Sequence, residues 1–366
     1  MPIDRRLLTH FEWVLPALVM IVTGIGIASI YSATHEAGVE APSPLAIRQL
    51  AYLGAGIVLM LLAVSFDYRR LDHQAFWVYG FCIALLVAVP LFGVIGGGSR
   101  RWIRLGPISI QPSEFVKLGL VVVLARWFSR LPSVRLDLRD AVPGLLLAGL
   151  PAAIILIQPD LGTAVHVGLI AVSMMLVGGV RVRWFALLAA PVVLLAPFLW
   201  GFLKEYQQKR ILMFLDPAQD PLGAGYHVIQ SKIAVGSGML YGKGFLQGTQ
   251  NSLDFLPEQH TDFVFSVFAE EWGFLGAVVL LLLYLAIMVR GLVIAARARD
   301  RFGLMLVAGV LAIVFWQLLV NIGMTTGVMP VVGITLPFVS YGGSSLLCLL
   351  LGIGLVMNVS MRRFLF

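Results

Sequence analysis

The sequence contains little charge and almost no cysteine. Charged residues make up 12% of its 366 residues, against about 25% in a typical soluble domain. The two cysteines, Cys82 and Cys348, both lie in apolar segments, which excludes a disulfide framework and zinc-ligand spacing. The basic residues form no basic helix in a polar domain, which excludes nucleic acid as a partner despite the net charge of +7.

What the sequence has instead is hydrophobic residues, which make up 59% of the chain and give a mean hydropathy of +0.93. A membrane-crossing helix needs about 20 apolar residues in succession, and such segments recur throughout. They predict an all-α polytopic membrane protein with about ten transmembrane helices, in a single membrane-embedded domain over residues 1–366. The fourth, fifth and sixth segments are short, so their ends are approximate. The predicted spans are Trp13–Tyr31, Leu50–Phe66, Ala75–Ile95, Ser113–Phe128, Ala141–Ile157, Thr163–Gly179, Trp184–Leu203, Phe263–Val289, Leu304–Met324 and Ser340–Val359.

The distribution of basic residues predicts how the chain is oriented in the membrane. Loops with an excess of Arg and Lys stay in the cytoplasm. Most of the 26 basic residues fall in segments that are cytoplasmic if the N-terminus is inside, so both termini are predicted to be cytoplasmic. Arg5 and Arg6 before the first span are typical of a signal peptide, but the length of that span favours a retained anchor.

One predicted connection is much longer than the others. Residues 204–261, between the seventh and eighth spans, form a long extracytoplasmic loop that is rich in Gly, Pro and Gln. Loops of this length are usually functional or disordered. Within it, the pattern from Gly225 to Lys232 indicates a short helix at the membrane interface.

The stretch that joins this loop to the eighth span holds four acids: Glu258, Asp262, Glu270 and Glu271. A helix turns by roughly 100° per residue, which puts Asp262 on a small or polar face with Ser266, Ala269, Gly273 and Gly276. We therefore expect a carboxylate at the outer mouth of a membrane helix, above a groove. Two other interpretations stay open: an N-cap role for Asp262, and close helix packing through the small residues.

Glu114 and Lys117 lie three residues apart at the outer start of the fourth span, where they can pair on one helix face. Ionisable residues within a span are costly and usually functional, although this pair could simply neutralise itself. Just upstream, the predicted outer loop 96–106 holds Arg100, Arg101 and Arg104 around Trp102.

Arginine's planar fork suits phosphate and carboxylate ligands. Together with Arg48, Lys117 and Arg210, the cluster in this loop predicts an anionic ligand at the outer leaflet. Trp102 could be only an aromatic residue of the membrane interface. His260 is isolated in the sequence and, on the residues alone, is read as a solvated loop histidine.

These motifs together resemble those of the SEDS family (shape, elongation, division and sporulation). The resemblance extends from the third span to the end of the chain. Gln259 favours the RodA branch of the family over the FtsW branch, which more often has Ala there. The motifs that carry the resemblance are Arg101-Trp102, Gln111-Pro-Ser-Glu-Phe-Val-Lys117, Gln158-Pro-Asp-Leu-Gly-Thr163, Leu256-Pro-Glu-Gln-His-Thr-Asp-Phe263, Ala269-Glu-Glu271, Met329-Pro330 and Leu336-Pro-Phe-Val-Ser-Tyr-Gly-Gly-Ser-Ser345.

The resemblance implies a peptidoglycan glycosyltransferase that polymerises lipid II at the outer face of the cytoplasmic (inner) membrane, for cell elongation and rod shape. It also implies a class B penicillin-binding protein as partner, and Asp262 as the essential aspartate that acts on lipid II and the nascent glycan strand. The residues expected to bind substrate are Arg48, Arg101, Trp102, Arg104, Gln111, Ser113, Glu114, Lys117, Arg210, Glu258, His260 and Thr261.

The chemistry of such a reaction agrees with these residues. A sugar on a lipid pyrophosphate already has a leaving group, so the enzyme needs a base for the acceptor hydroxyl and cations for the pyrophosphate. A single carboxylate suits inversion at the anomeric carbon, by analogy with the base of inverting glycosidases. The cations could be Arg101, Arg104, Lys117 or Arg210, or a bound divalent metal such as Mg or Mn, and the sequence does not choose among them.

Other classes of function fit part of the pattern. A transporter that flips lipid II would also use outer cations and intramembrane acids, but here the acids gather at one face and the inner half of the spans is nearly uncharged. A purely structural scaffold would leave Asp262 dispensable. Within the family, the alternative is an FtsW-type division polymerase.

The partner's single span is expected to pack against the eighth or ninth helix. The ninth contains Gly309 and Ala312, small residues that permit close approach of another helix, although they could serve internal packing. The loop from Lys204 to Thr261 would then transmit activation to Asp262.

Overall fold

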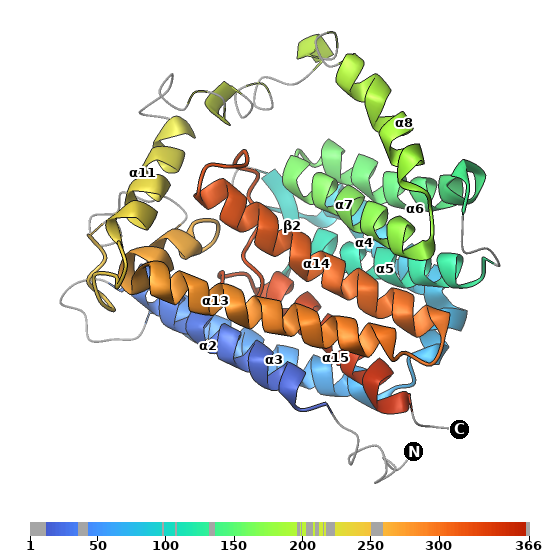
Figure 1. The fold of residues 1–366 in the computed structure, drawn as a ribbon, viewed down its shortest axis with the longest axis horizontal. Coiled ribbons are helices and arrows are strands. Elements are labelled where there is room, and N and C mark those ends of the chain that lie inside the picture. The colour runs from blue at the N-terminus through green and yellow to red at the C-terminus, as the bar shows by residue number, and fades with distance from the viewer. Residues whose placement is uncertain are drawn as a thin grey trace.

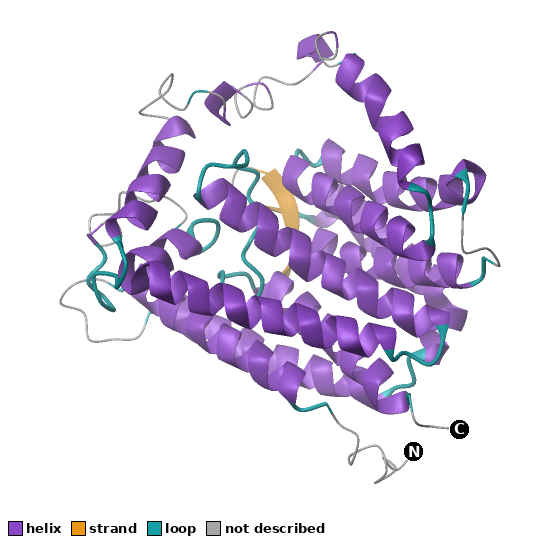
Figure 2. Ribbon diagram, viewed as in Figure 1, coloured by secondary structure: helices purple, strands orange, loops and turns teal. Residues whose placement is uncertain are grey.

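The computed structural model describes residues 12–35, 43–96, 99–106, 108–131, 136–195, 198, 200–202, 208, 212–214, 216, 224–249 and 259–363. Long helices lie alongside one another in a bundle (Figure 1), and Figure 2 shows how little strand accompanies them. This architecture confirms the predicted all-α polytopic class. The helices are α2 (Val14–Ala33), α3 (Pro44–Ser65), α4 (Arg69–Phe92), α5 (Pro112–Ser129), α6 (Leu138–Ile157), α7 (Leu161–Gly178), α8 (Val182–Leu194), η1 (Trp200–Phe202), α11 (Ala224–Ser237), α13 (Val264–Ala296), α14 (Arg301–Thr325) and α15 (Gly343–Arg362).

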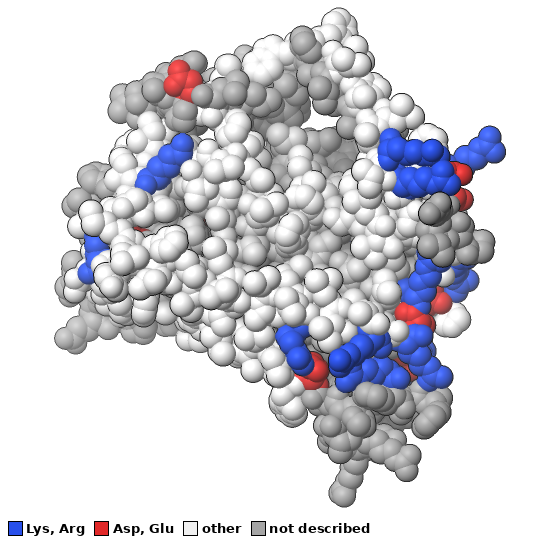
Figure 3. Space-filling view, viewed as in Figure 1, with Lys and Arg blue, Asp and Glu red and all other residues white. Residues whose placement is uncertain are grey.

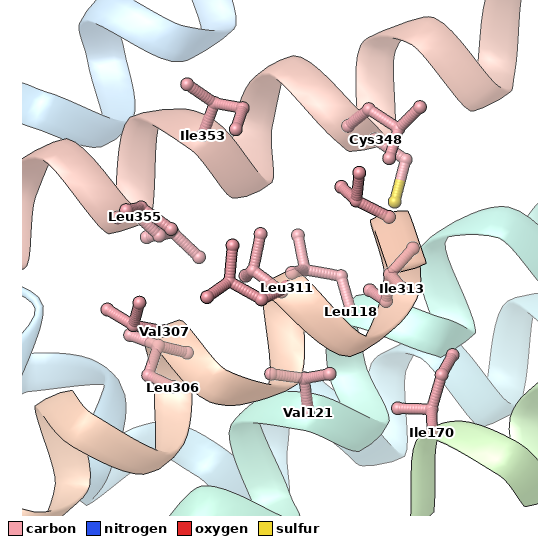
Figure 4. Packing of buried hydrophobic residues seen from close by; sticks show 14 of the residues in the cluster. Leu118, Val121, Ile170, Leu306, Val307, Leu311, Ile313, Cys348, Ile353 and Leu355 are labelled. Carbon is pink, nitrogen blue, oxygen red and sulfur yellow. The ribbon is translucent and has the colours of Figure 1, made fainter. Parts of the chain in front are cut away.

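The centre of the bundle is formed by α5, α14 and α15. In the most apolar 18-residue stretch of α15, 94% is buried inside the structure, whereas the corresponding stretch of α3 is 22% buried. The α15 helix therefore lies inside the bundle and α3 faces outward. Figure 4 shows their side chains interleaved, among them Val121 of α5, Leu311 of α14 and Ile353 of α15. Because lipid tails are as apolar as these side chains, close packing of this kind holds the helices together.

The small residues of α14 serve this internal packing. A Cβ atom on Gly309 would lie 2.4 Å from the side chain of Val121 and 2.9 Å from the sulfur of Met174. Ala312 is only 7% exposed. Helices of the same chain therefore cover the face of Gly309 and Ala312, and the expectation that a partner docks on this face is wrong.

Eight of the described helices are long and apolar enough to cross a membrane. The seventh predicted span, Trp184–Leu203, is not a single helix. In its place α8 has 13 residues and ends at Leu194, which corresponds to about 20 Å at 1.5 Å per residue and falls short of a hydrocarbon core of about 30 Å. Figure 1 shows α8 extending away from the rest of the bundle. The other predicted spans each overlap one described helix.

The segment predicted as a short arginine-rich loop folds into a small antiparallel sheet of β1 (Val94–Gly96), β2 (Ser99–Leu105) and β3 (Ile108–Ile110). β2 lies in the middle, and Ile103 pairs with Ile110 across the β2–β3 ladder. Two of these strands, β1 and β3, have only three residues each, which is too short for an alternating pattern to reveal them in the sequence. The sheet leads directly into α5, whose first turn begins with Pro112.

The α13 helix is broken at Gly273, where φ is 65° and ψ is −165°. Residues 238–244, which follow α11, fill the break, and a Cβ on Gly273 would lie 2.3 Å from the amide nitrogen of Gly242. Only glycine tolerates this backbone shape and this close approach. The backbone groups freed by the break are bonded by the same loop: Lys243 N to Glu270 O (3.0 Å), Gly244 N to Glu271 O (3.0 Å), Phe274 N to Met239 O (2.8 Å) and Leu275 N to Leu240 O (3.1 Å).

This break corrects one expectation and refines another. Because the helix is interrupted at Gly273, the predicted continuous face from Asp262 to Gly276 does not exist. The 14-residue helix α11 confirms that the long loop contains a short helix. The hydrogen bonds of residues 239–244 also show that this loop packs into the break in α13.

Candidate functional site

Asp262 lies in a turn just before α13, and its side chain is partly exposed. The N-cap residue of α13 is Phe263, so the N-cap interpretation of Asp262 is wrong. The Oδ2 atom of Asp262 lies over Gly333, where an added Cβ would be only 3.3 Å away. Gly333 has a φ of +73°, which favours glycine and lets the carboxylate lie directly against the backbone.

Neutral groups hold the backbone on which Asp262 is carried. The buried Asn321 of α14 donates from Nδ2 to the carbonyl oxygen of Asp262 at 3.0 Å and to that of Ile334 at 2.7 Å. Ser340 donates its hydroxyl to the carbonyl oxygen of Thr261 at 2.6 Å. The amide of Tyr341 donates to the carbonyl oxygen of His260 at 2.9 Å. Asp262 is thereby fixed to the segment that connects α14 to α15.

The connecting segment, residues 326–342, brings other motifs to the same place. A Cβ on Gly162, in the first turn of α7, would lie 2.2 Å from the carbonyl oxygen of Val332. Gln49 of α3 donates to the carbonyl oxygen of Ser340 and accepts from the amide of Gly342, both at 3.3 Å. The motifs around Gly162, Asp262 and Ser340 therefore meet at one junction.

Arg101 of β2 is engaged by the turn between α6 and α7. Its guanidinium lies 3.3 Å from the Asp160 carboxylate and donates to the carbonyl oxygens of Gln158 at 3.3 Å and Pro159 at 2.5 Å. Asp160 in turn caps α7 by accepting from the amide of Thr163 at 3.1 Å. Arg101 thus clamps the start of the helix that supports the junction.

Glu114 and Lys117 form the ion pair that their spacing predicts, with 2.7 Å between Oε1 and Nζ. Both side chains are buried, with 10% of Glu114 and 2% of Lys117 exposed. The start of α5 is tied to α15, because the amide of Gln111 donates to the Ser344 hydroxyl at 2.9 Å. Ser113 is also buried in this first turn.

The remaining predicted residues are distributed around this framework. Arg48 is exposed on α3 and lies near the Tyr341 side chain, and the centre of the Tyr341 ring is 5.8 Å from that of His260. Burial raises the pKa of Tyr341, although Arg48 opposes this shift, so the phenol stays protonated at neutral pH. On β2, Trp102 is half-buried and Arg104 exposed. Arg210 and Glu258 lie outside the described residues.

Two supporting groups are not among the residues predicted from the sequence. Asn321 is a polar residue within an apolar span. Its position could have been recognised from the sequence, because polar residues in a span are costly and usually functional. The second is the Lys243 ammonium, which lies 2.6 Å from the fully buried Glu270 carboxylate. Thr249 also donates to that carboxylate from its amide, at 3.0 Å. These contacts fix residues 243–249 to the half of α13 that follows Asp262.

Comparisons with known proteins place the chain in one family. The family model for the cell cycle proteins FtsW, RodA and SpoVE matches residues 11–364. Peptidoglycan glycosyltransferase MrdB of Escherichia coli K12 is 44% identical over 317 residues, which cover 86% of this chain and 85% of that protein.

Two solved structures share the fold. A chain from a peptidoglycan synthase complex that coordinates polymerization and crosslinking superposes with a TM-score of 0.82, at 35% identity, over 97% of this chain and 99% of that one. The rod shape determining protein RodA of Thermus thermophilus superposes with a TM-score of 0.72, at 32% identity, over 97% and 98%.

Fold and site define a polytopic membrane protein with an aspartate held where several motif loops meet. The chain belongs to the FtsW, RodA and SpoVE family, which is the SEDS family that its motifs resemble. Relatives such as MrdB of Escherichia coli and RodA of Treponema pallidum are named peptidoglycan glycosyltransferases, and the chain is an enzyme of the glycosyltransferase class.

Proposed function

We propose that this glycosyltransferase polymerises lipid II into glycan strands at the outer face of the cytoplasmic membrane, for cell elongation, with Asp262 as the general base. The observation that carries the proposal is the Asp262 carboxylate, which lies over Gly333 where the family motifs meet. Arg297 directly follows α13 and Arg301 begins α14 at the opposite end of the bundle. The positive-inside rule assigns that basic end to the cytoplasm, so Asp262 faces outward.

The reaction needs one proton acceptor at this position. A bond forms between the acceptor hydroxyl oxygen and the anomeric carbon of the lipid-linked sugar, while the bond from that carbon to the pyrophosphate breaks. The lipid pyrophosphate leaves with the electron pair, and Asp262 takes the proton of the hydroxyl. Because Asn321 and Ser340 hold its backbone, the carboxylate is positioned before substrate arrives.

Among the predicted cations, Arg48 is our first candidate to bind the pyrophosphate. It is exposed, and it contacts Tyr341, whose amide is bonded to His260. Arg101 and Lys117 are paired with Asp160 and Glu114, so we assign them positioning roles. Among the described residues, no three His, Cys, Asp or Glu side chains form a group that could hold a metal ion.

For the partner, a class B penicillin-binding protein, the outer face of α13 is the candidate docking surface. It exposes a row of large apolar side chains, with Val279, Leu282 and Leu285 each more than half exposed. The same helix contains the break that residues 238–244 fill. A span packed on α13 would contact the helix that follows Asp262 and act on the loop through this break. The relative from a peptidoglycan synthase complex supports a partner of this kind.

Polymerisation of lipid II by the purified full-length protein, with and without its partner, tests the proposal. We expect Asp262→Asn to lower the rate at least a hundredfold, because general-base catalysis contributes about 10²–10⁴. Asp137→Asn is the matched control, since Asp137 lies at the basic end and is 56% exposed. If Asp262→Asn polymerises at a near-normal rate, the base assignment is wrong. If the wild type moves lipid II across vesicles without making polymer, the protein is a transporter.

A further inference from the structure

A groove that glycosyl transfer does not use opens between α4, α5 and α6, near the basic end of the bundle. It consists of two adjoining cavities that share Phe76 and Trp127. The first, of about 210 Å³, is also lined by Arg126, Arg130 and Leu131. The second, of about 310 Å³, is also lined by Tyr79, Pro143, Leu146, Leu147 and Leu150.

The first cavity is lined by two arginine side chains, Arg126 and Arg130. Arg130 lies 3.0 Å from one carboxylate oxygen of Asp72, and Arg126 lies 3.7 Å from the other. Arg126 also donates to the backbone carbonyl of Asp72, and its guanidinium lies 5.4 Å from the centre of the Phe76 ring. Two guanidinium groups face one carboxylate, which leaves a net positive charge beside two aromatic rings.

The second cavity is apolar and open to the surroundings of the bundle. Leu146 is 69% exposed and Leu150 49%, so this wall faces the lipid. The polar group of Tyr79 is already satisfied, because its hydroxyl donates to the carbonyl oxygen of Leu147 at 2.6 Å. Cations at one end and a lipid-facing apolar channel at the other match the two parts of a phospholipid.

We propose that this groove binds an anionic phospholipid of the cytoplasmic leaflet. The phosphate lies between Arg126 and Arg130, and an acyl chain runs along Trp127 toward Leu150. Basic pockets between transmembrane helices on the cytoplasmic side are suited to anionic headgroups, and arginine forks suit phosphate oxygens. Phosphatidylglycerol carries a net negative charge and phosphatidylcholine carries none, so the net positive charge of Arg126 and Arg130 over Asp72 favours phosphatidylglycerol.

Native mass spectrometry of the full-length protein in detergent tests the proposal, with phosphatidylglycerol or phosphatidylcholine added at equal concentration. We expect phosphatidylglycerol to remain bound where phosphatidylcholine does not, and to raise the melting temperature, since a ligand that binds only the folded state stabilises it. Addition of inorganic phosphate should not displace the lipid.

Two variants probe the two parts of the groove separately. Arg130→Gln removes one cation from a side chain that is 54% exposed, and it should weaken phosphatidylglycerol binding about fivefold, the usual effect of one basic residue at an anionic surface. Leu146→Trp fills the apolar channel without changing the charge, and it should also reduce binding.

Each variant has a matched control. Arg183 is 60% exposed, pairs with Asp137 and contacts the Trp184 ring, but lines neither cavity. Arg183→Gln should therefore leave lipid binding unchanged. Leu61 is 54% exposed on α3, which makes Leu61→Trp the control for added bulk on the lipid face. The proposal is overturned if both lipids bind equally, if inorganic phosphate displaces the lipid, or if the controls lose as much binding as the groove variants.

Discussion

The segment that carries Asp262 and the basic end of the bundle are held by different kinds of interaction. Residues 260–262 are fixed by neutral hydrogen bonds from Asn321, Ser340 and the amide of Tyr341. At the basic end, ion pairs join the elements, with Asp72 between two arginines and Asp137 between two more. Figure 3 shows the blue and red residues gathered mainly on that side.

The difference has a physical reason. Neutral hydrogen-bond donors fix the position of the segment that carries the carboxylate without placing another charge beside it. They therefore add no charge that would interact with an anionic substrate at the site. Ion pairs near the site, such as Arg101 with Asp160, support neighbouring helices instead. At the basic end the guanidinium groups also determine orientation in the membrane, so charge there has a role beyond holding the structure together.

Two buried asparagines make this comparison direct. Asn321 of α14 and Asn358 of α15 are both fully buried, and each donates to backbone carbonyl groups of another segment of the chain. Asn321 holds the segment with Asp262, whereas Asn358 holds the end of α3 at Ala63 and Val64. The same interaction therefore serves the site at one end and only the fold at the other.

The largest effect is expected from the Glu114–Lys117 pair, a buried ion pair near the start of α5. Glu114→Gln or Lys117→Met leaves the other charge uncompensated in a buried place, which costs about 3–5 kcal/mol of folding free energy. The double variant removes both charges and should cost less than the sum of the single changes. Chemical unfolding of all four proteins in detergent measures this cycle, and strictly additive losses would show that the two charges are not coupled.

An intermediate effect is expected from the asparagines. Asn321→Ala and Asn358→Ala each leave buried carbonyl groups without a donor, so both should lower the free energy of unfolding by about 1–3 kcal/mol. Only Asn321→Ala should also lower kcat for lipid II polymerisation, by about tenfold to a hundredfold, because it releases the backbone of Asp262.

Asn358→Ala serves as the control for this prediction, since it removes side-chain hydrogen bonds at the other end of the bundle, and more of them than Asn321→Ala removes. Activity is measured at a temperature where both variants remain folded, and melting curves on the same samples establish this. Equal losses of kcat in the two variants would mean that Asn321 has only a structural role.

The long helices and the ion pair near the candidate site could be predicted from the sequence for clear physical reasons. A helix that crosses lipid must be apolar for about 20 residues, so α2 or α14 is visible as a hydrophobic segment. Charged residues are rare in such a chain, which makes Asp262 and the Glu114–Lys117 pair conspicuous. The spacing of three residues fixes the geometry of that pair within one helix, and the structure agrees.

The contacts that hold the candidate site in place could not be predicted from the sequence, because they join segments that are distant in the chain. Asn321 and Asp262 are 59 positions apart, and no local pattern shows that they meet. The break at Gly273 lies inside an apolar segment, where a glycine is ordinarily tolerated within a helix. The partner of Arg101 is likewise in a turn 59 residues away, at Asp160. Such pairings follow from the packing of whole helices rather than from local sequence.

The smallest effect is expected from the exposed ion pairs of the basic end. Asp137 lies 3.5 Å from Arg181 and 3.6 Å from Arg183, and all three side chains are more than a third exposed. Exposed pairs contribute about 0–1 kcal/mol because water and salt screen them. Asp137→Asn keeps a side chain that can cap α6, so the free energy of unfolding should change by less than about 1 kcal/mol. Melting curves at low and high salt check this, because any difference from the wild type should shrink as salt rises. A large loss that persists at high salt would show that ion pairs at this end contribute as much to the fold as the buried pair in α5.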